Sequence, residues 1–274
     1  MKCIICDEHT TVSTWADCGD HKAIKCAQCD FIWIDPMPTD KELDEFYVNF
    51  NDLRDALGHE YNKKREMQYL IDRDFINNFF IDQKNVITLD FGCYDGSFID
   101  TFDGRYIKYG VEKNTTAAEW AQNNRIFGTN VYSCDVVDIP HEDEYFDLIM
   151  MRGVIEHLND PNRVMRKLYR LLKSGGILYI CATPNVGSYS AKKFRNKWNQ
   201  FTIPEHVLYF SDITLEKYLD KYGFDMIAKH FPYSETPYAN LKKDFNSIKQ
   251  DYNDKVNTPF YNNMVNAVFY KRGQ

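Results

Sequence analysis

Four cysteines near the N-terminus have the spacing of metal ligands. Cys3 and Cys6 form one C-x2-C pair, and Cys26 and Cys29 form a second. Two thiolates in one tight turn can face the same ion, and two such turns supply the four sulfurs that Zn²⁺ accepts in tetrahedral geometry. A site with four protein ligands has no open position, so we expect a structural zinc ion; the alternative is four unrelated buried thiols. Three residues between the pairs could replace one thiolate: His9, Cys18 and His21.

A glycine-bearing loop, LDFGCYDGSF (89–98), follows a predicted strand and leads into a predicted helix. Its D-x-G-x-x-x-G spacing is typical of nucleotide-binding α/β units, because glycines let the backbone turn tightly and approach a ligand closely. The same kind of turn is also common in ordinary packing, so the loop alone is a weak signal. The loop residues that we expect to contact a cofactor are Asp90, Gly92, Cys93, Tyr94 and Gly96.

Two carboxylates strengthen this interpretation. Glu112 ends the next predicted strand, where a carboxylate would accept hydrogen bonds from ribose hydroxyls. Asp135 follows the third predicted strand, where it would meet an adenine amino group, although Asp138 could serve instead. The alternative for each is a solvated carboxylate at a strand end.

The elements that would position these residues are short apolar runs separated by room for helices. Such strands are typical of a parallel sheet covered on both faces, so the sequence predicts a doubly wound α/β domain. A last apolar run, MVNAVFY (264–270), is expected to be an edge or hairpin strand. The runs are VITLDF (86–91), YIKYGVE (106–112), TNVYS (129–133), FDLIMMR (146–152) and ILYICA (177–182).

Three units are expected along the chain. Residues 1–34 hold five of the eight cysteines and form a small, zinc-ribbon-like knot. Residues 35–84 are a linker with N-terminal helices: the prolines of DPMPTD (35–40) resist helix, and the following pattern is helical. Residues 85–274 are the α/β domain. The apolar stripe expected on the N-terminal helices is Leu70, Ile71, Phe75, Ile76, Phe79 and Phe80.

The charge and composition narrow the function classes. Lys and Arg number 33 against 40 Asp and Glu, a net charge of −7, so the chain lacks the overall positive charge of a nucleic-acid binder. No apolar stretch is long enough to span a membrane, and the N-terminus lacks the apolar core of a secretory signal. We therefore expect a cytoplasmic protein whose cysteines are thiols or metal ligands.

Four motifs together resemble the class I S-adenosylmethionine (SAM)-dependent methyltransferases, and more narrowly the branch that methylates small molecules such as quinones and sugars. The loop LDFGCYDGSF resembles the first motif of that family and FDLIMMRGVIEHLNDP (146–161) the fourth. RKLYRLLKSGGILYICATPN (166–185) and PEHVLYFSDITLEKYLDKYGF (204–224) are similar to the later ones. The paired cysteines followed by Pro-x-Pro also look like bacterial methyltransferases that modify sugars or other small molecules.

The resemblance implies a seven-stranded mixed sheet with a reversed last hairpin, SAM as cofactor and a small-molecule acceptor. Gly92 and Gly96 would border the methionine part of SAM, and Arg152 would line the floor of the site. Glu112 would hold the ribose and Asp135 the adenine. The sequence departs from the family at Tyr94, where a third glycine is usual; a tyrosine costs about 1 kcal/mol if that position needs positive φ.

Transfer to a hydroxyl group needs a base, and histidine suits neutral pH. His157 and His206 are the candidates, each with the alternative of a structural role, and Glu156 could orient His157. The insert 185–203 could form a lid over a phosphate-bearing acceptor such as a nucleotide-linked sugar, or be a solvated helix face. Its basic residues are Lys192, Lys193, Arg195 and Lys197, and Trp198 and Phe201 would add aromatic surface.

Two other functions stay open. An RNA methyltransferase could grip nucleic acid with the zinc knot, although the net charge makes this partner unlikely. A SAM-binding protein without turnover would explain Tyr94. The sequence does not give the oligomeric state.

Overall fold

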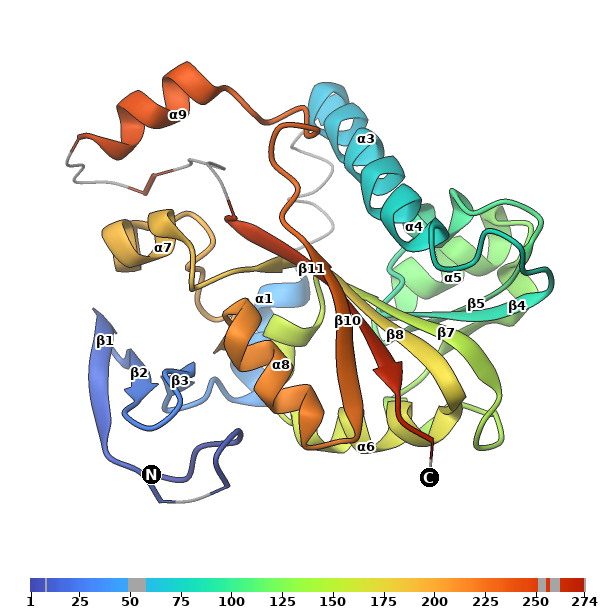
Figure 1. Ribbon diagram of the computed structural model, residues 1–274, viewed down its shortest axis with the longest axis horizontal. Coiled ribbons are helices and arrows are strands. Elements are labelled where there is room, and N and C mark those ends of the chain that lie inside the picture. The colour runs from blue at the N-terminus through green and yellow to red at the C-terminus, as the bar shows by residue number, and fades with distance from the viewer. Residues whose placement is uncertain (8, 49–57, 251–254, 257–261, 274) are drawn as a thin grey trace.

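A computed structural model describes residues 1–7, 9–48, 58–250, 255–256 and 262–273 (Figure 1). The main sheet contains β4 (Val86–Phe91), β5 (Tyr106–Glu112), β6 (Val131–Ser133), β7 (Phe146–Arg152), β8 (Leu172–Pro184), β10 (Phe224–His230) and β11 (Met264–Lys271). Their order is β10-β11-β8-β7-β4-β5-β6. The neighbouring strands from β8 to β6 pair in parallel, whereas β11 is antiparallel to both β8 and β10. The predicted seven-stranded mixed sheet is confirmed.

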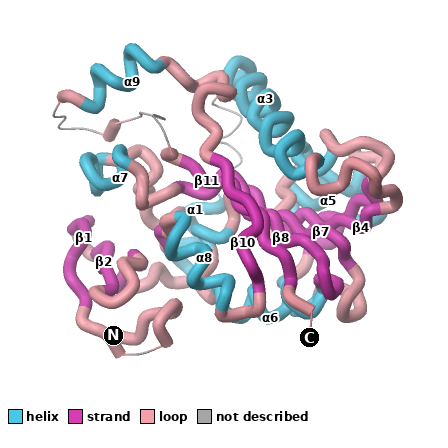
Figure 2. The backbone as a smooth tube through the Cα atoms, viewed as in Figure 1, coloured by secondary structure: helices cyan, strands magenta, loops and turns pink. Residues whose placement is uncertain are grey.

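Helices cover both faces of this sheet, because successive side chains of its strands point to opposite sides. On β7, Leu148 and Met150 join a buried cluster with residues of α3 (Gly58–Asn77), α4 (Ser97–Asp100) and α5 (Thr115–Asn124). Ile149 and Met151 join a second cluster with residues of α6 (Pro161–Leu171) and α8 (Asp212–Asp220). Figure 2 shows strands enclosed by helices in this way, as expected for a doubly wound domain.

A second, four-stranded sheet lies at the N-terminus. It contains β1 (Val12–Cys18), β2 (His21–Cys26), β3 (Ile32–Asp35) and β9 (Leu208–Tyr209), all antiparallel to their neighbours. The fourth strand comes from the α/β domain, since Ile32 pairs with Tyr209 and Trp33 with Leu208. The N-terminal ribbon is therefore completed by residues from the late part of the chain.

In the sequence between β3 and β4, α1 (Asp40–Val48) follows the linker. Residues 49–57 of the region predicted as helical lie outside the described residues. The stripe predicted on α3 is wrong at Leu70, which is 42% exposed, whereas Ile76 and Phe80 are buried. The helix presents to the sheet the face that carries Tyr69 and Asp72, which are also buried, so Leu70 points outward.

The aromatic surface predicted on the insert is also wrong. The insert contains α7 (Tyr189–Phe194), but Trp198 and Phe201 are buried against the N-terminal sheet. The Trp198 indole donates a hydrogen bond to the Asn263 side chain at 2.7 Å, and the Phe201 ring packs on Tyr209. These aromatic residues join the insert to the ribbon and do not offer a ligand-facing surface.

The C-terminal part differs in detail from the prediction. The run 264–270 is the hairpin strand β11, paired on both sides, and β10 is the edge. The sequence does not predict β10, because its longest apolar run is only Met226–Ala228 and polar residues flank that run. The polar stretch 234–262 contains α9 (Leu241–Ile248), and its residues 251–254 and 257–261 lie outside the described residues. None of the helices in the described part of the chain is long and apolar enough to cross a membrane.

Candidate functional site

The glycine loop lies between β4 and α4, and three of its residues have left-handed backbone conformations. The φ angles are 77° at Gly92, 51° at Tyr94 and 73° at Gly96. A Cβ atom on Gly92 would lie 2.6 Å from Cγ2 of Val154, so only glycine fits there. The structure shows that the position of Tyr94 does require positive φ, and the tyrosine adopts it.

Glu112, at the end of β5, holds this loop in place. Its carboxylate accepts hydrogen bonds from the backbone N–H groups of Tyr94 at 2.8 Å and Asn114 at 2.7 Å. A carboxylate offers about four lone-pair positions, so about two remain for hydroxyl groups of a ligand. Burial raises the pKa of Glu112, and the backbone hydrogen bonds oppose that rise.

Asp90, the last residue but one of β4, is 1% exposed. Burial raises its pKa to about 7; Arg152 opposes the rise, and the carboxylates of Glu112 and Asp95 add to it. Among the residues that the structure describes, none forms a hydrogen bond with the buried Oδ2 atom of Asp90. A cationic group of a ligand would compensate this carboxylate.

These residues surround one hollow at the carboxyl edge of the sheet, where ligands bind in open α/β folds. Its volume is about 30 Å³, room for about two or three water molecules. A nucleoside-sized ligand is larger than this hollow. The lining residues are Arg65, Tyr69, Asp90, Gly92, Cys93, Tyr94, Asp95, Phe98 and Arg152.

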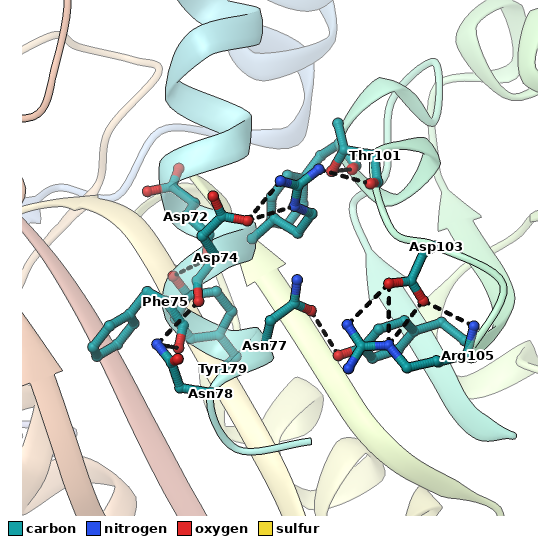
Figure 3. A network of polar contacts seen from close by, with 12 residues as sticks. Asp72, Asp74, Phe75, Asn77, Asn78, Thr101, Asp103, Arg105 and Tyr179 are labelled. Atoms are coloured by element: carbon teal, nitrogen blue, oxygen red, sulfur yellow. Dashed lines mark hydrogen bonds and ion pairs between the residues drawn. The ribbon is translucent and has the colours of Figure 1, made fainter. Parts of the chain in front are cut away.

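Arg152 ends β7 and is fixed by Asp72 of α3. Its Nη2 and Nε atoms lie 2.8 Å and 2.9 Å from Oδ2 of Asp72, which is fully buried. The guanidinium also lies over the Tyr69 ring, 4.5 Å from the centroid. The backbone of Asp72 also joins α3 to the sheet, because the Tyr179 hydroxyl of β8 donates a hydrogen bond to the Asp72 carbonyl oxygen (Figure 3).

Sequence reasoning missed the contribution of α3 to this hollow. Arg65, Tyr69 and Asp72 lie on one helix face at spacings of four and three. Arg65 and Asp72 are charged residues on a helix face that is otherwise apolar, and this pattern could have indicated that the face contacts polar groups.

Asp135 lies at the start of a short 3₁₀ helix (Val136–Asp138), outside the hollow lining. Its carboxylate accepts a hydrogen bond from the backbone N–H of Val137 and forms an ion pair of 3.0 Å with Arg163. The side chain is 40% exposed. The structure thus does not bring Asp135 into direct contact with the glycine loop.

The two candidate histidines do come together. His157 is in a 3₁₀ helix (Ile155–His157) after β7, His206 precedes β9, and their ring centroids are 4.7 Å apart. The Nδ1 atoms lie 2.8 Å and 2.7 Å from the backbone carbonyl oxygens of Glu205 and Gln200 respectively.

Burial shifts the three titratable groups of this region toward their neutral forms. The pKa of His157 falls to about 3, with the neighbouring His206 adding to the effect of burial. The pKa of His206 is lowered as well. The buried carboxyl of Glu156 has its pKa raised to about 8.

The four N-terminal cysteines form a compact cluster. Sγ of Cys3 lies 3.6 Å from Sγ of Cys29, and Sγ of Cys6 lies 3.9 Å from Sγ of Cys26. Tetrahedral ligands 2.3 Å from zinc would be roughly 3.8 Å apart, so the spacing suits that ion. His21, one of the alternative ligands, is engaged elsewhere by the Pro36 carbonyl oxygen.

Comparisons with known proteins agree with this geometry. A family model described as "Methyltransferase domain" matches residues 61–229. The chain is 30% identical over 81 residues to 2-methyl-6-phytyl-1,4-hydroquinone methyltransferase 1 of Oryza sativa subsp. japonica, covering 30% of this chain and 24% of that protein. It is 26% identical over 194 residues to the mitochondrial ubiquinone biosynthesis O-methyltransferase of Candida albicans, covering 65% and 54%. The chain thus spans between a quarter and about half of these relatives.

A solved structure is similar over nearly the whole chain. The 1,6-didemethyltoxoflavin-N1-methyltransferase of Burkholderia thailandensis, with bound 1,6-didemethyltoxoflavin and S-adenosylhomocysteine, covers 90% of this chain and 97% of its own, with TM-score 0.57 and 15% identity. At that identity the likeness shows the fold alone.

Proposed function

Since the chain belongs to the class I SAM-dependent methyltransferases, we propose that it transfers a methyl group to a small-molecule acceptor, most simply to a hydroxyl of a sugar, a nucleotide-linked sugar or a related metabolite. The main observation in support of SAM as the cofactor is the glycine loop, which is hydrogen-bonded to Glu112 and follows the buried Asp90 carboxylate.

Three features of the described residues support SAM as the cofactor. SAM supplies a methyl group that is already activated on a sulfonium sulfur. The left-handed Gly92 and Gly96 let the backbone approach the ligand, and the remaining lone pairs of Glu112 suit the two ribose hydroxyls. The Oδ2 atom of Asp90 suits a cationic ammonium group. Asp135 keeps its proposed adenine contact only if its ion pair with Arg163 opens.

The acceptor side is proposed at His157, which follows β7 at the carboxyl edge of the main sheet, and at His206, whose ring packs against it. Both imidazoles are neutral and can accept a proton from a hydroxyl, although the burial that lowers their pKa also weakens them as bases. Since the Nδ1 atoms bond to carbonyl oxygens, each accepts through Nε2.

The cysteine cluster is proposed as a structural zinc site. Its four sulfurs have near-tetrahedral spacing, and the same thiols would be reduced in the cytoplasm, where we place the protein. Metal analysis of the purified protein tests this: we expect one zinc per chain, lost in Cys6→Ser.

The function is tested by isothermal titration calorimetry with SAM and S-adenosylhomocysteine. We expect micromolar binding that weakens at least about tenfold in Glu112→Ala, because each hydrogen bond to a carboxylate contributes about 1.5–3 kcal/mol. Glu119→Ala, on the exposed face of α5, is the matched control and should bind like the wild type. Absence of binding by folded protein would refute the proposal. Binding then justifies a mass-spectrometric screen of nucleotide-sugars for methylated products.

One surface favours RNA as a second acceptor class. Four basic side chains of α6 border a hollow of about 490 Å³ beside Val137, Tyr169 and Tyr222; they are Arg163, Arg166, Lys167 and Arg170. Retention on RNA that falls with salt and is lost in Arg166→Glu would support this alternative. A silent SAM-binding protein would instead bind the cofactor and methylate nothing in either screen.

A further inference from the structure

Glu156, His157 and His206 form a second cluster of potential metal ligands, separate from the four cysteines. Each offers one ligand atom, and these atoms all lie within 4.8 Å of one another. Glu156 and His157 come from the 3₁₀ helix after β7, and His206 comes from the segment before β9. Two distant parts of the chain therefore bring two imidazoles and one carboxylate to one point.

Backbone hydrogen bonds fix how both rings present themselves. A carbonyl oxygen only accepts hydrogen bonds, so the Nδ1 atoms facing Glu205 and Gln200 must carry the protons. In the neutral ring the lone pair then lies on Nε2. Metal-binding histidines have this arrangement, in which the second ring nitrogen donates to a carbonyl or a carboxylate that sets the ring orientation.

The carboxylate completes the set. Glu156 is 2% exposed, and its Oε2 atom accepts a hydrogen bond from Thr183 at 3.3 Å. Its Oε1 atom lies 4.0 Å from Nε2 of His157. Three groups whose lone pairs can bind one cation thus meet at a place where Glu156 and His206 are buried and His157 is partly buried.

From this juxtaposition we infer that Glu156, His157 and His206 bind a divalent first-row transition metal ion, such as Zn²⁺, Mn²⁺, Fe²⁺ or Co²⁺. Two imidazoles and one carboxylate suit these ions, whereas Mg²⁺ and Ca²⁺ prefer oxygen ligands alone. Ligands about 2.1 Å from one ion lie roughly 3–3.4 Å apart, so ligand atoms within 4.8 Å of one another approach by up to about 1.8 Å on binding.

Three protein ligands leave coordination positions open for an oxygen atom of a substrate. In this part the inference rests on the proposed function and replaces its base: an acceptor hydroxyl bound to the ion would lose its proton to solvent water more easily, and the two histidines would be ligands in place of proton acceptors. The metal site itself stands on the geometry alone and does not require methyl transfer.

The probe is Co²⁺, titrated into the protein with its cysteine site loaded with zinc and followed by visible absorption. We expect one equivalent to bind with the weak d–d bands of nitrogen and oxygen ligands and without thiolate charge-transfer bands. His206→Ala and Glu156→Gln should each weaken binding at least about tenfold. His230→Ala, a histidine outside the cluster, is the matched control and should titrate like the wild type.

Glu156→Gln preserves the shape of the side chain, so it keeps the test valid if His206→Ala fails to fold. Equal Co²⁺ affinity in the wild type and in Glu156→Gln would overturn the inference, as would cobalt bound only to thiolates. SAM calorimetry on the same samples separates this failure from failure of the proposed function, since the cofactor loop contains none of the three ligands.

Discussion

Replacement of Gly92 by alanine should destabilise the protein for two separable reasons. The first is the backbone, because φ is 77° and a left-handed conformation costs a non-glycine residue about 1 kcal/mol. The second is steric: the new Cβ would lie 2.6 Å from Cγ2 and 3.3 Å from Cγ1 of Val154. Overpacking of this kind costs about 1–3 kcal/mol, so we expect a total loss of about 2–4 kcal/mol in the free energy of unfolding.

Two other glycines separate these contributions. Gly19 has φ of 82°, but a Cβ added to it would meet no atom within 4 Å, so Gly19→Ala should show the backbone cost alone, about 1 kcal/mol. Gly104 has neither positive φ nor a close neighbour. Gly104→Ala should be neutral or stabilise the protein by up to about 1 kcal/mol, since alanine restricts the unfolded chain.

The assay is urea unfolding followed by circular dichroism, with Gly92→Ala measured in the wild type and in a Val154→Ala background. Removal of the two valine methyl groups should reduce the cost of Gly92→Ala to about that of Gly19→Ala. The coupling energy of the cycle should therefore be about 1–3 kcal/mol. Additive effects, or equal costs at Gly92 and Gly19, would show that the loop is not packed against Val154 as described.

Three further predictions concern charges and metal. Because burial raises the pKa of Asp90 to about 7, the folded protein binds more protons than the unfolded chain between about pH 4 and 7. The melting temperature of the wild type should therefore fall relative to that of Asp90→Asn as the pH rises through that window. Melting temperatures of the two proteins that change in parallel with pH would contradict this. Arg152→Met should lower the free energy of unfolding, measured in urea, by about 3–5 kcal/mol, because it leaves the buried Asp72 carboxylate without its cation. A smaller loss than that of the exposed-site variant Arg170→Met would be inconsistent with a buried ion pair. Cys6→Ser should lower the melting temperature and slow methylation of the acceptor, because β3 pairs with β9 next to His206. SAM affinity should stay within about twofold of the wild type. A loss of SAM affinity as large as the loss of methylation would argue against separate cofactor and acceptor regions.

The strands of the main sheet could be predicted from sequence because their signal is local. The apolar runs at 86–91 and 146–152 form β4 and β7 with the same bounds. Buried parallel strands are apolar on both faces, so they need no knowledge of their partners. Along the edge strand β10 exposed and less exposed residues alternate, and its longest apolar run is only three residues.

The site was predictable where it depends on the loop and on the ends of strands. Gly92, Tyr94 and Arg152 share one hollow because the ends of neighbouring parallel strands lie at one edge. The charged positions of α3 could have indicated a polar contact, but its partner was not predictable, since nothing local indicates that Asp72 meets a strand eighty positions later. The same holds for Trp198 and Phe201, whose burial depends on the N-terminal sheet.

The pairing of β3 with β9 also constrains the order in which the chain can fold. Strands β1 to β3 are synthesised before β9, so their sheet lacks its last strand until residues 208–209 have been made. Until then the edge of β3 is unpaired, and such an edge is a site where another chain can add. Contacts this distant in sequence form slowly, so the ribbon should be among the last parts of the described chain to reach its final structure.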